Sequence, residues 1–222
     1  MKIGTDAVLL GAWCSVYYEV DSILDIGTGT GIIALQLAQR SDANTIDAVE
    51  IDALAFEQAT NNFEQSKWSD RLYCYHTSFD EFVKEISSEN ETYDLIITNP
   101  PFYSDTFETQ NDSRNKARFT SSLSFKSLIE GVSKLLSKKG TFSVIIPFKE
   151  EPSFIALALS NQLYLQKACR VRGTIHTNIK RSLLEFSFEE SETSYTELTI
   201  EYKRHVYTEE YIYLTKDFYL KM

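Results

Sequence analysis

Cysteine and histidine are scarce in this chain of 222 residues. The three cysteines, Cys14, Cys74 and Cys169, lie far apart without a C-x-x-C pair, and the three histidines are scattered singly. A disulfide framework or a zinc site needs such residues at close, regular spacing, so the sequence argues against both. We therefore expect no bound metal, and we expect the cysteines to be small core residues in a reducing cytoplasm.

Long hydrophobic runs and flexible linkers are also missing. The apolar run over residues 7–13 is too short to cross a bilayer, which takes about 20 residues, and it lacks a signal-peptide pattern. No Gly/Ser/Pro-rich stretch separates two parts of the chain, and 43% hydrophobic residues are enough to fill one core. We predict a soluble cytoplasmic protein with a single domain over residues 1–222.

Positive charge is in deficit, with 22 Lys and Arg against 32 Asp and Glu and a net charge of −10. The basic residues are nevertheless concentrated, because residues 114–181 carry 13 of them against 3 acidic residues, a local charge of +10. Salt screens charges beyond roughly 8–10 Å, so a local basic surface can hold phosphates on an acidic protein. The candidate RNA-binding residues are Arg114, Lys116 and Arg118, followed by Lys167, Arg170, Arg172, Lys180 and Arg181. Ordinary solvated faces are the alternative.

Strand and helix patterns alternate along most of the chain. Strands are predicted near residues 22–26, 45–49, 72–76, 94–98 and 141–147, with helices near 32–40, 53–66, 80–87 and 125–137 between them. After residue 147 we predict a helix near 154–160, extended runs near 163–172, 183–189 and 197–202, and a tail helix from about 208. This pattern predicts an α/β fold with a doubly wound, mostly parallel seven-stranded sheet and an antiparallel edge strand.

A glycine-rich turn between the first strand and the first helix of this alternation indicates a nucleoside site. Its motif is Asp25-x-Gly27-x-Gly29-x-Gly31, in which glycine lets the backbone approach a ligand without a β-carbon. The spacing differs from the G-x-G-x-x-G of dinucleotide folds, which favours a nucleoside without phosphates. Glu50 ends the next strand about twenty residues later, where an acid accepts hydrogen bonds from ribose hydroxyls. Helix capping or a solvated turn is the alternative role for both acids.

The tetrapeptide Asn99-Pro100-Pro101-Phe102 directly follows the apolar strand 94–98. Two prolines can neither continue a strand ladder nor open a helix normally, so the strand must end at Asn99. Ligands of open α/β sheets bind beyond the carboxyl ends of the strands. We therefore expect Asn99 and Phe102 to face a site, the alternative being a surface loop that the prolines terminate.

Together these motifs resemble those of class I S-adenosylmethionine-dependent methyltransferases that modify a planar amine. The block Lys2–Trp13 and the ending Asp217–Met222 further resemble the bacterial valine-tRNA adenine-N6-methyltransferase family, so that the resemblance covers essentially the whole chain. Members of that family carry a short segment ahead of this block, whereas this chain begins inside it. The resemblance implies S-adenosyl-L-methionine as the cofactor, tRNA as the partner and a monomer. It divides the domain into a cofactor-closing segment (1–20), a cofactor-binding core (21–150) and a sheet edge with a C-terminal extension (151–222).

The resemblance also assigns roles to individual residues. The four residues of the catalytic loop, Asn99, Pro100, Pro101 and Phe102, would hold the target base. The cofactor would be bound by Thr5, Asp25, Gly27, Gly29, Gly31, Glu50, Ile51, Ser78 and Phe79. Ser78 departs from the family, which generally carries an acid there, and Asp80 is an alternative partner for the adenine ring.

Other functions share parts of this pattern. Asn-Pro-Pro-aromatic motifs also occur in guanine-N2 methyltransferases of ribosomal RNA and in glutamine-N5 methyltransferases of termination factors. The Lys2–Trp13 block and the lack of a separate recognition domain favour the tRNA enzyme. A scaffold that binds cofactor without catalysis is a further alternative, against which the intact Asn99 and glycine motif argue.

Overall fold

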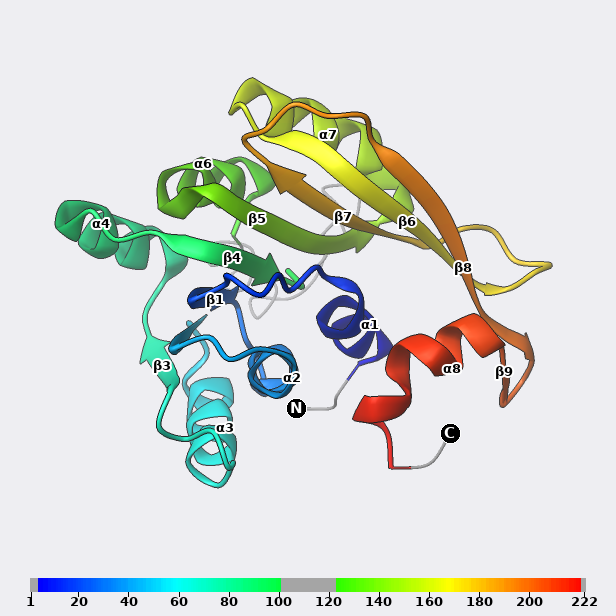
Figure 1. The fold of residues 1–222 in the computed structure, drawn as a ribbon, viewed down its shortest axis with the longest axis horizontal. Coiled ribbons are helices and arrows are strands. Elements are labelled where there is room, and N and C mark those ends of the chain that lie inside the picture. The colour runs from blue at the N-terminus through cyan, green and yellow to red at the C-terminus, as the bar shows by residue number, and fades with distance from the viewer. Residues whose placement is uncertain (1–3, 101–122, 221–222) are drawn as a thin grey trace, which may run out of the picture.

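A computed structural model describes residues 4–100 and 123–220 of the chain. Its strands form one sheet in the order β3-β2-β1-β4-β5-β7-β6-β8-β9 (Figure 1). The strands are β1 (Ser22–Ile26), β2 (Thr45–Glu50), β3 (Leu72–His76), β4 (Tyr93–Thr98), β5 (Leu136–Pro147), β6 (Tyr164–Thr174), β7 (Arg181–Ser187), β8 (Ser194–Lys203) and β9 (Val206–Tyr207). The helices are α1 (Thr5–Trp13), α2 (Ile32–Arg40), α3 (Ala53–Glu64), α4 (Phe79–Glu89), α6 (Phe125–Leu135), α7 (Glu151–Ser160) and α8 (Glu209–Thr215), with short 3-10 turns η1 (Phe148–Glu150) and η2 (Lys216–Phe218).

The sheet confirms the predicted fold class. The strands β3, β2, β1, β4 and β5 are parallel, and β7 runs antiparallel between β5 and β6. The described sheet is wider than the predicted seven strands, because β8 pairs in parallel with β6 and β9 then pairs with β8. The extended run predicted near residues 197–202 lies within β8, where Leu198, Ile200 and Tyr202 alternate with polar residues.

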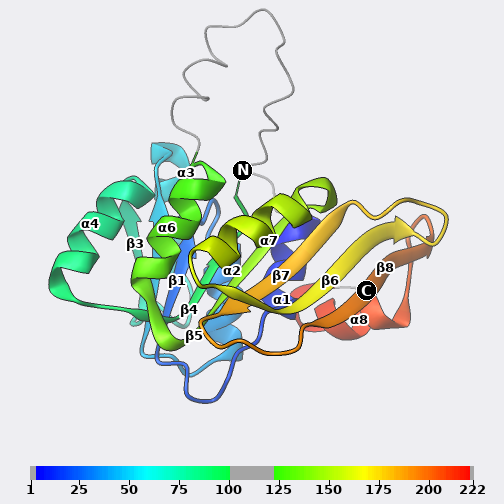
Figure 2. The same cartoon turned by 90° about the horizontal axis from the view of Figure 1, so that it is seen from above.

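Two hydrophobic clusters cover the two faces of the sheet. One includes residues of α1, α2, α3 and α8, and the other includes residues of α4, α6 and α7. Figure 2 shows α6 and α7 together on the near side of the sheet with α1 behind it. Within the described ranges, no helix has the length and hydrophobicity that a membrane crossing requires.

The N-terminal apolar run forms α1, a helix whose residues 7–12 are all buried. Its C-terminal carbonyls are capped from α2, since the Arg40 guanidinium donates to the Gly11 oxygen at 2.5 Å and to the Cys14 oxygen at 3.0 Å. Sequence patterns did not predict this helix, because a segment that is apolar on every side has no helical periodicity to detect.

The start of strand β5 also differs from the prediction. Strand β5 begins at Leu136, five residues before the predicted start at residue 141. The intervening Ser137-Lys138-Lys139-Gly140 has the composition of a turn, yet Leu136 pairs with Tyr93 of β4 across a register shift. Pairing with a neighbouring strand therefore overrides the local preference of these residues.

Candidate functional site

The carboxyl ends of three neighbouring strands form the candidate site. Ile26 of β1 lies opposite Val49 of β2 on one side and opposite Thr98 of β4 on the other. The next residues along β1, β2 and β4 are Gly27, Glu50 and Asn99. These three residues therefore lie side by side, because neighbouring strands are about 4.8 Å apart. The strand order also reverses between β1 and β4, and this switch point is where open α/β sheets bind ligands.

The glycine turn uses left-handed backbone three times. The φ angles of Gly27, Gly29 and Gly31 are 68°, 60° and 79°. Residues other than glycine rarely adopt such positive φ angles. A β-carbon on Gly27 would meet nothing within 4 Å, whereas one on Gly31 would lie 2.5 Å from Cε1 of Phe63. Gly27 therefore leaves open space beside the turn, while Gly31 allows the turn to pack closely on α3.

Helix α3 also holds the turn through a side chain that sequence reasoning missed. The Asn62 amide Nδ2 donates to the Thr30 carbonyl at 2.8 Å, and the ring of Phe63 lies beneath Gly31. No local motif marks Asn62, because its partner is 32 residues away in the sequence. The adjacent Asn61 instead bonds the Glu57 carbonyl within its own helix.

Glu50 is a buried carboxylate that binds the glycine turn directly. Its Oε2 accepts a hydrogen bond from the Gly29 amide at 2.8 Å, and its Oε1 accepts one from the Asp52 amide at 2.9 Å. Asp52, rather than Glu50, caps α3 by accepting from the Ala55 amide. Each Glu50 oxygen keeps a second lone pair, so the group can still accept from a ligand hydroxyl.

Asp25 is fully buried at the end of β1 beneath the same turn. Its Oδ2 accepts a hydrogen bond from the Thr28 hydroxyl at 2.6 Å, and Oδ1 makes no hydrogen bond of normal geometry within the described part of the chain. Burial raises the pKa of this carboxyl to about 7, with hydrogen bonds from Thr28 and the Ala34 amide acting in the opposite direction. A buried carboxylate of this kind favours a cationic ligand group.

Ile51 projects at the rim of the site, with 52% of its surface exposed. Its carbonyl is hydrogen-bonded to Nε2 of His76 at 3.2 Å, and the His76 ring stacks on Phe56 with centroids 5.0 Å apart. The backbone of Ile51 is thus held beside Glu50, while its apolar side chain stays exposed. His76 is a second supporting residue that the sequence did not reveal. No group of His, Cys, Asp or Glu suited to a metal ion occurs in the described ranges.

Ser78 and Phe79 have structural roles in this fold. Ser78 forms a capping box at the start of α4, accepting from the Glu81 amide and donating to the Glu81 carboxylate at 2.8 Å. Phe79 is 6% exposed and packs so closely on α6 that a β-carbon on Gly131 would lie 2.4 Å from its ring. Their predicted contact with the adenine ring stays a prediction.

The beginning of the predicted catalytic loop is anchored to β1. The Thr98 hydroxyl donates to the Ile26 carbonyl at 2.8 Å, and it is followed by a half-buried Asn99 and a buried Pro100. The other loop residues and the first basic group lie outside the described residues, namely Pro101, Phe102, Arg114, Lys116 and Arg118.

The second basic group begins at the end of the sheet where the site strands finish, and its charge is largely neutralised by acidic side chains. Its members are Lys167, Arg170, Arg172, Lys180 and Arg181. Register places Pro147, at the end of β5, opposite Arg181, and Arg181 opposite Val171 of β6. Three of its arginines form ion pairs, Arg170 with Glu151 at 2.7 Å, Arg172 with Glu197, and Arg181 with Asp6 at 2.8 Å. The Asp6 contact brings the start of α1, with Thr5, to this end of the sheet. Lys180 is exposed.

Lys167, the remaining member of that group, faces the interior. Its ammonium lies 3.5 Å from the buried Glu185 carboxylate and 4.1 Å from the centre of the Trp13 ring. The Glu185 carboxylate also accepts from the Ser15 amide at 2.8 Å. Lys167 therefore anchors the end of α1 to the sheet rather than facing a ligand in solution.

Comparison with known proteins gives consistent matches. The family model described as methyltransferase small domain matches residues 8–155. The chain is 56% identical over its full length to a protein of Christiangramia forsetii named tRNA1(Val) (adenine(37)-N6)-methyltransferase, covering 92% of that protein. A protein of Flavobacterium johnsoniae with the same name is 55% identical, again over the whole chain and 94% of its own length.

Solved structures share the fold. The crystal structure of a predicted O-methyltransferase from Agrobacterium tumefaciens superposes with a TM-score of 0.74 at 16% identity, covering 96% of each chain. The ribosomal protein L11 methylase of Lactobacillus delbrueckii gives a TM-score of 0.57 at 16% identity, covering 83% of this chain and 77% of its own. At such low identity these structures show the common architecture alone.

Proposed function

Because this chain belongs to the methyltransferase small domain family, we propose that it has the activity for which its full-length relatives are named. It would then be a tRNA1(Val) (adenine(37)-N6)-methyltransferase. The reaction transfers a methyl group from S-adenosyl-L-methionine to N6 of adenine 37. The single observation that best supports this function is the strand register that sets Glu50, Gly27 and Asn99 side by side at the switch point. A nucleoside cofactor and a planar amine can thus be held by adjacent strand ends.

The residues present fit the cofactor. S-adenosyl-L-methionine supplies an electrophilic methyl group on a positively charged sulfonium. The buried Asp25 carboxylate lacks a cationic partner in the described part of the chain and sits beneath the glycine turn, where it would balance the positive charge of the methionine part. The open side of Gly27 leaves room for the ligand, Glu50 would accept from the ribose hydroxyls, and Ile51 would cover one face of the adenine.

Asn99 and Pro100 would prepare the target amine. The lone pair of an aromatic amine is delocalised into its ring and does not point at the methyl group. If the Asn99 side-chain oxygen and the Pro100 carbonyl accept from its two N–H bonds, the lone pair leaves conjugation and turns toward the methyl carbon. No ionised base is required, since the alkylated amine is acidic enough to lose its proton to these acceptors or to water. Placement of two reactants in line can supply on the order of 7–11 kcal/mol.

Phe102 would stack on the target base, as the sequence predicts. Such stacking is worth roughly 1–3 kcal/mol. This offsets the few kcal/mol needed to unstack a base, a cost that is lowest in a single-stranded loop such as the anticodon loop.

The test is tritiated methyl transfer to three acceptors in parallel, namely tRNA, ribosomal RNA and a peptide-chain termination factor. We expect label in tRNA as N6-methyladenosine, identified by nucleoside mass spectrometry. Label found only in ribosomal RNA or only in the termination factor would replace this function with one of the rival classes. Cofactor binding without transfer to any acceptor would support the scaffold.

A tRNA substrate implies a place of action and a simple assembly. We propose the cytoplasm, where tRNA is modified and used. The single domain over residues 1–222 and the monomeric state remain predictions from the sequence. Light scattering of the purified protein measures the assembly directly.

A further inference from the structure

Three side chains form a row beside the start of α7, and the middle one, Arg170, belongs to the second basic group described above. The Arg170 guanidinium carbon lies 5.4 Å from the centre of the Phe148 ring and 5.3 Å from the centre of the Tyr195 ring. Both distances are within the range of cation–π contact. The row therefore contains an aromatic ring, a planar cation and a second aromatic ring.

The guanidinium in the middle of this row is held in one orientation. Its Nη2 and Nε donate to Oε1 of Glu151 at 2.7 and 3.2 Å. Glu151 is 4% exposed and also accepts from the Ser182 hydroxyl, so the carboxylate cannot swing away. The planar group is thus fixed before any ligand arrives.

The row is open to solvent but carries little net charge. Tyr195 is 56% exposed, Phe148 is half-buried, and 35% of the Arg170 side-chain surface is exposed. Glu151 neutralises Arg170, and Glu197 neutralises the adjacent Arg172. A neutral surface that exposes aromatic rings suits the faces of unstacked bases, whereas phosphates require unpaired positive charge.

Register places the row next to the proposed site. Thr98, the last residue of β4, is in line with Val144, Leu184, Ala168 and Tyr195 across β5, β7, β6 and β8. At about 4.8 Å per strand, Arg170 on β6 lies roughly 14 Å and Tyr195 on β8 roughly 19 Å along the sheet from β4. Phe148 follows the end of β5, the strand next to β4.

We propose that Phe148, Arg170 and Tyr195 form a stacking surface for the nucleotides that flank the target adenine. The inference rests on the proposed function and specifies how the same site holds its RNA. Unstacked bases of single-stranded loops stack on aromatic side chains and on arginine planes. A target base beside Asn99 would leave its neighbours within reach of this row.

The test replaces Tyr195, because removal of Arg170 would leave the buried Glu151 without its cationic partner and would destabilise the fold. We expect Tyr195→Ala to raise KM for the tRNA about 5- to 150-fold, the range for loss of one stacked base. KM for S-adenosyl-L-methionine should not change. Tyr195→Phe keeps the ring and should behave like the unmodified enzyme.

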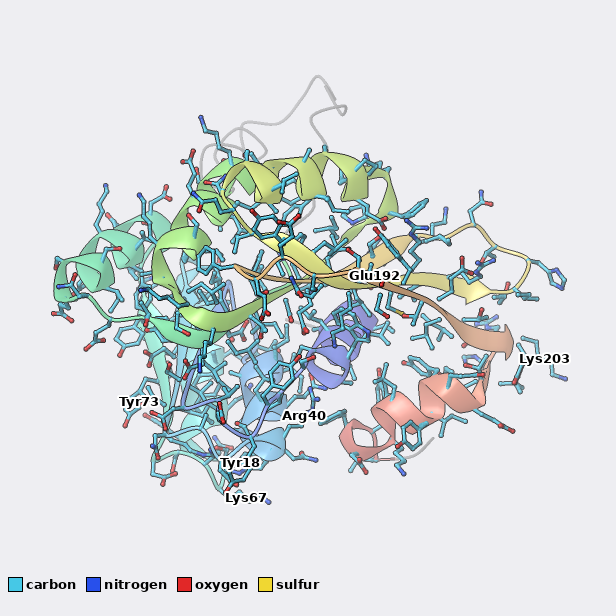
Figure 3. All side chains as sticks on the ribbon, turned by 45° about the horizontal axis from the view of Figure 1, so that its top comes forward. Tyr18, Arg40, Lys67, Tyr73, Glu192 and Lys203 are labelled. Carbon is cyan, nitrogen blue, oxygen red and sulfur yellow. The ribbon has the colours of Figure 1, made fainter. Side chains whose placement is uncertain are left out.

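The matched control is Tyr202→Ala. Tyr202 is 60% exposed on the same strand, which runs from just after Glu192 to Lys203 in Figure 3. It lies seven positions after Tyr195, an odd offset, so the two side chains lie on opposite faces of β8. Tyr202→Ala should leave KM for tRNA within about twofold of the unmodified enzyme.

A second variant tests the middle of the row. Arg170→Lys keeps the charge opposite Glu151 but loses the planar group, so we expect a higher KM for tRNA with an unchanged dependence on salt. The inference is overturned if the unmodified enzyme methylates tRNA and Tyr195→Ala has the same KM, or if Tyr202→Ala weakens tRNA use equally. If the unmodified enzyme transfers nothing to tRNA, the proposed function itself fails.

Discussion

At the scale of single residues, the proposed mechanism assigns the central role to Asn99. We expect Asn99→Ala to lower kcat by about 100-fold or more, the usual cost of losing one preorganised hydrogen bond at a reacting group. Affinity for S-adenosylhomocysteine should stay the same, because the amide would touch the target amine only. Single-turnover kinetics and calorimetry measure the two quantities. A variant with normal turnover would remove Asn99 from the mechanism.

We expect Asp25 to make cofactor binding depend on pH. Its pKa is about 7 in the folded protein, against an ordinary value of 3.8, so folding takes up a proton between these values. The contribution of Asp25 to stability is therefore fully present below about pH 4 and is lost as the pH rises toward 7.

A cationic ligand binds the ionised carboxylate better, so the effect on affinity has the opposite sign. We expect affinity for S-adenosyl-L-methionine to rise by up to about tenfold per pH unit as the pH rises toward 7 and to level off above it. Calorimetry at pH 5.5 to 8 measures this. Asp25→Asn should show a flat profile. Asp47→Asn is the matched control, since burial also raises the pKa of Asp47, which instead accepts from the Tyr93 hydroxyl at 2.6 Å.

Asn62 and Asn61 offer a test of the support beneath the glycine turn. Asn62→Ala removes the hydrogen bond to Thr30, and the loss of about 1 kcal/mol should raise KM for S-adenosyl-L-methionine about fivefold with kcat little changed. Asn61→Ala removes a bond within α3 only and should change neither constant. Equal effects of the two variants would mean that Asn62 supports the helix rather than the turn.

At the scale of elements, α1 packs closely on α2, the helix that follows the glycine turn. A β-carbon on Gly11 would lie 2.3 Å from Oε1 of Gln36, and Gln36 also donates to the Val8 carbonyl at 3.1 Å. We expect Gly11→Ala to lower the free energy of unfolding by about 1–3 kcal/mol. Denaturant titration measures this. Gly173→Ala should be nearly neutral, since its β-carbon would come no closer than 3.7 Å to another side chain.

At the scale of the whole molecule, two exposed lysines, Lys180 and Lys67, lie at opposite ends of the parallel strands. Lys180 is exposed at the end of the sheet where the strands of the candidate site finish. Lys67 lies in the loop between α3 and the amino end of β3. Figure 3 shows Lys67 at the bottom of the view, away from Glu192, which precedes the start of β8.

The positions of these two lysines predict how tRNA binding responds to salt. We expect Lys180→Ala to weaken binding and to lower the slope of log affinity against log salt by about 1, as for the loss of one phosphate contact. Fluorescence anisotropy at several salt concentrations measures the slope. Lys67→Ala is the control and should leave it unchanged. An unaltered slope in Lys180→Ala would place the phosphates elsewhere.

Local sequence determined the parallel part of the sheet and the positions of its strand ends. The confirmed alternation arises from buried strands and amphipathic helices, and these leave a repeating pattern in neighbouring residues. The glycines at 27, 29 and 31 were recognisable for the same reason, since a left-handed turn restricts the residue type at each position itself.

Tertiary structure alone decided which charges are free and how far the sheet extends. The sequence predicted Arg170, Arg172 and Arg181 as an RNA-binding group, but each meets an acid from another element, and Arg181 pairs with Asp6, 175 positions away. No local pattern records such a pairing, because it depends on how the chain folds back on itself. The buried helix α1 was hidden for a related reason, since helical periodicity appears only where one face is buried and the other is in water.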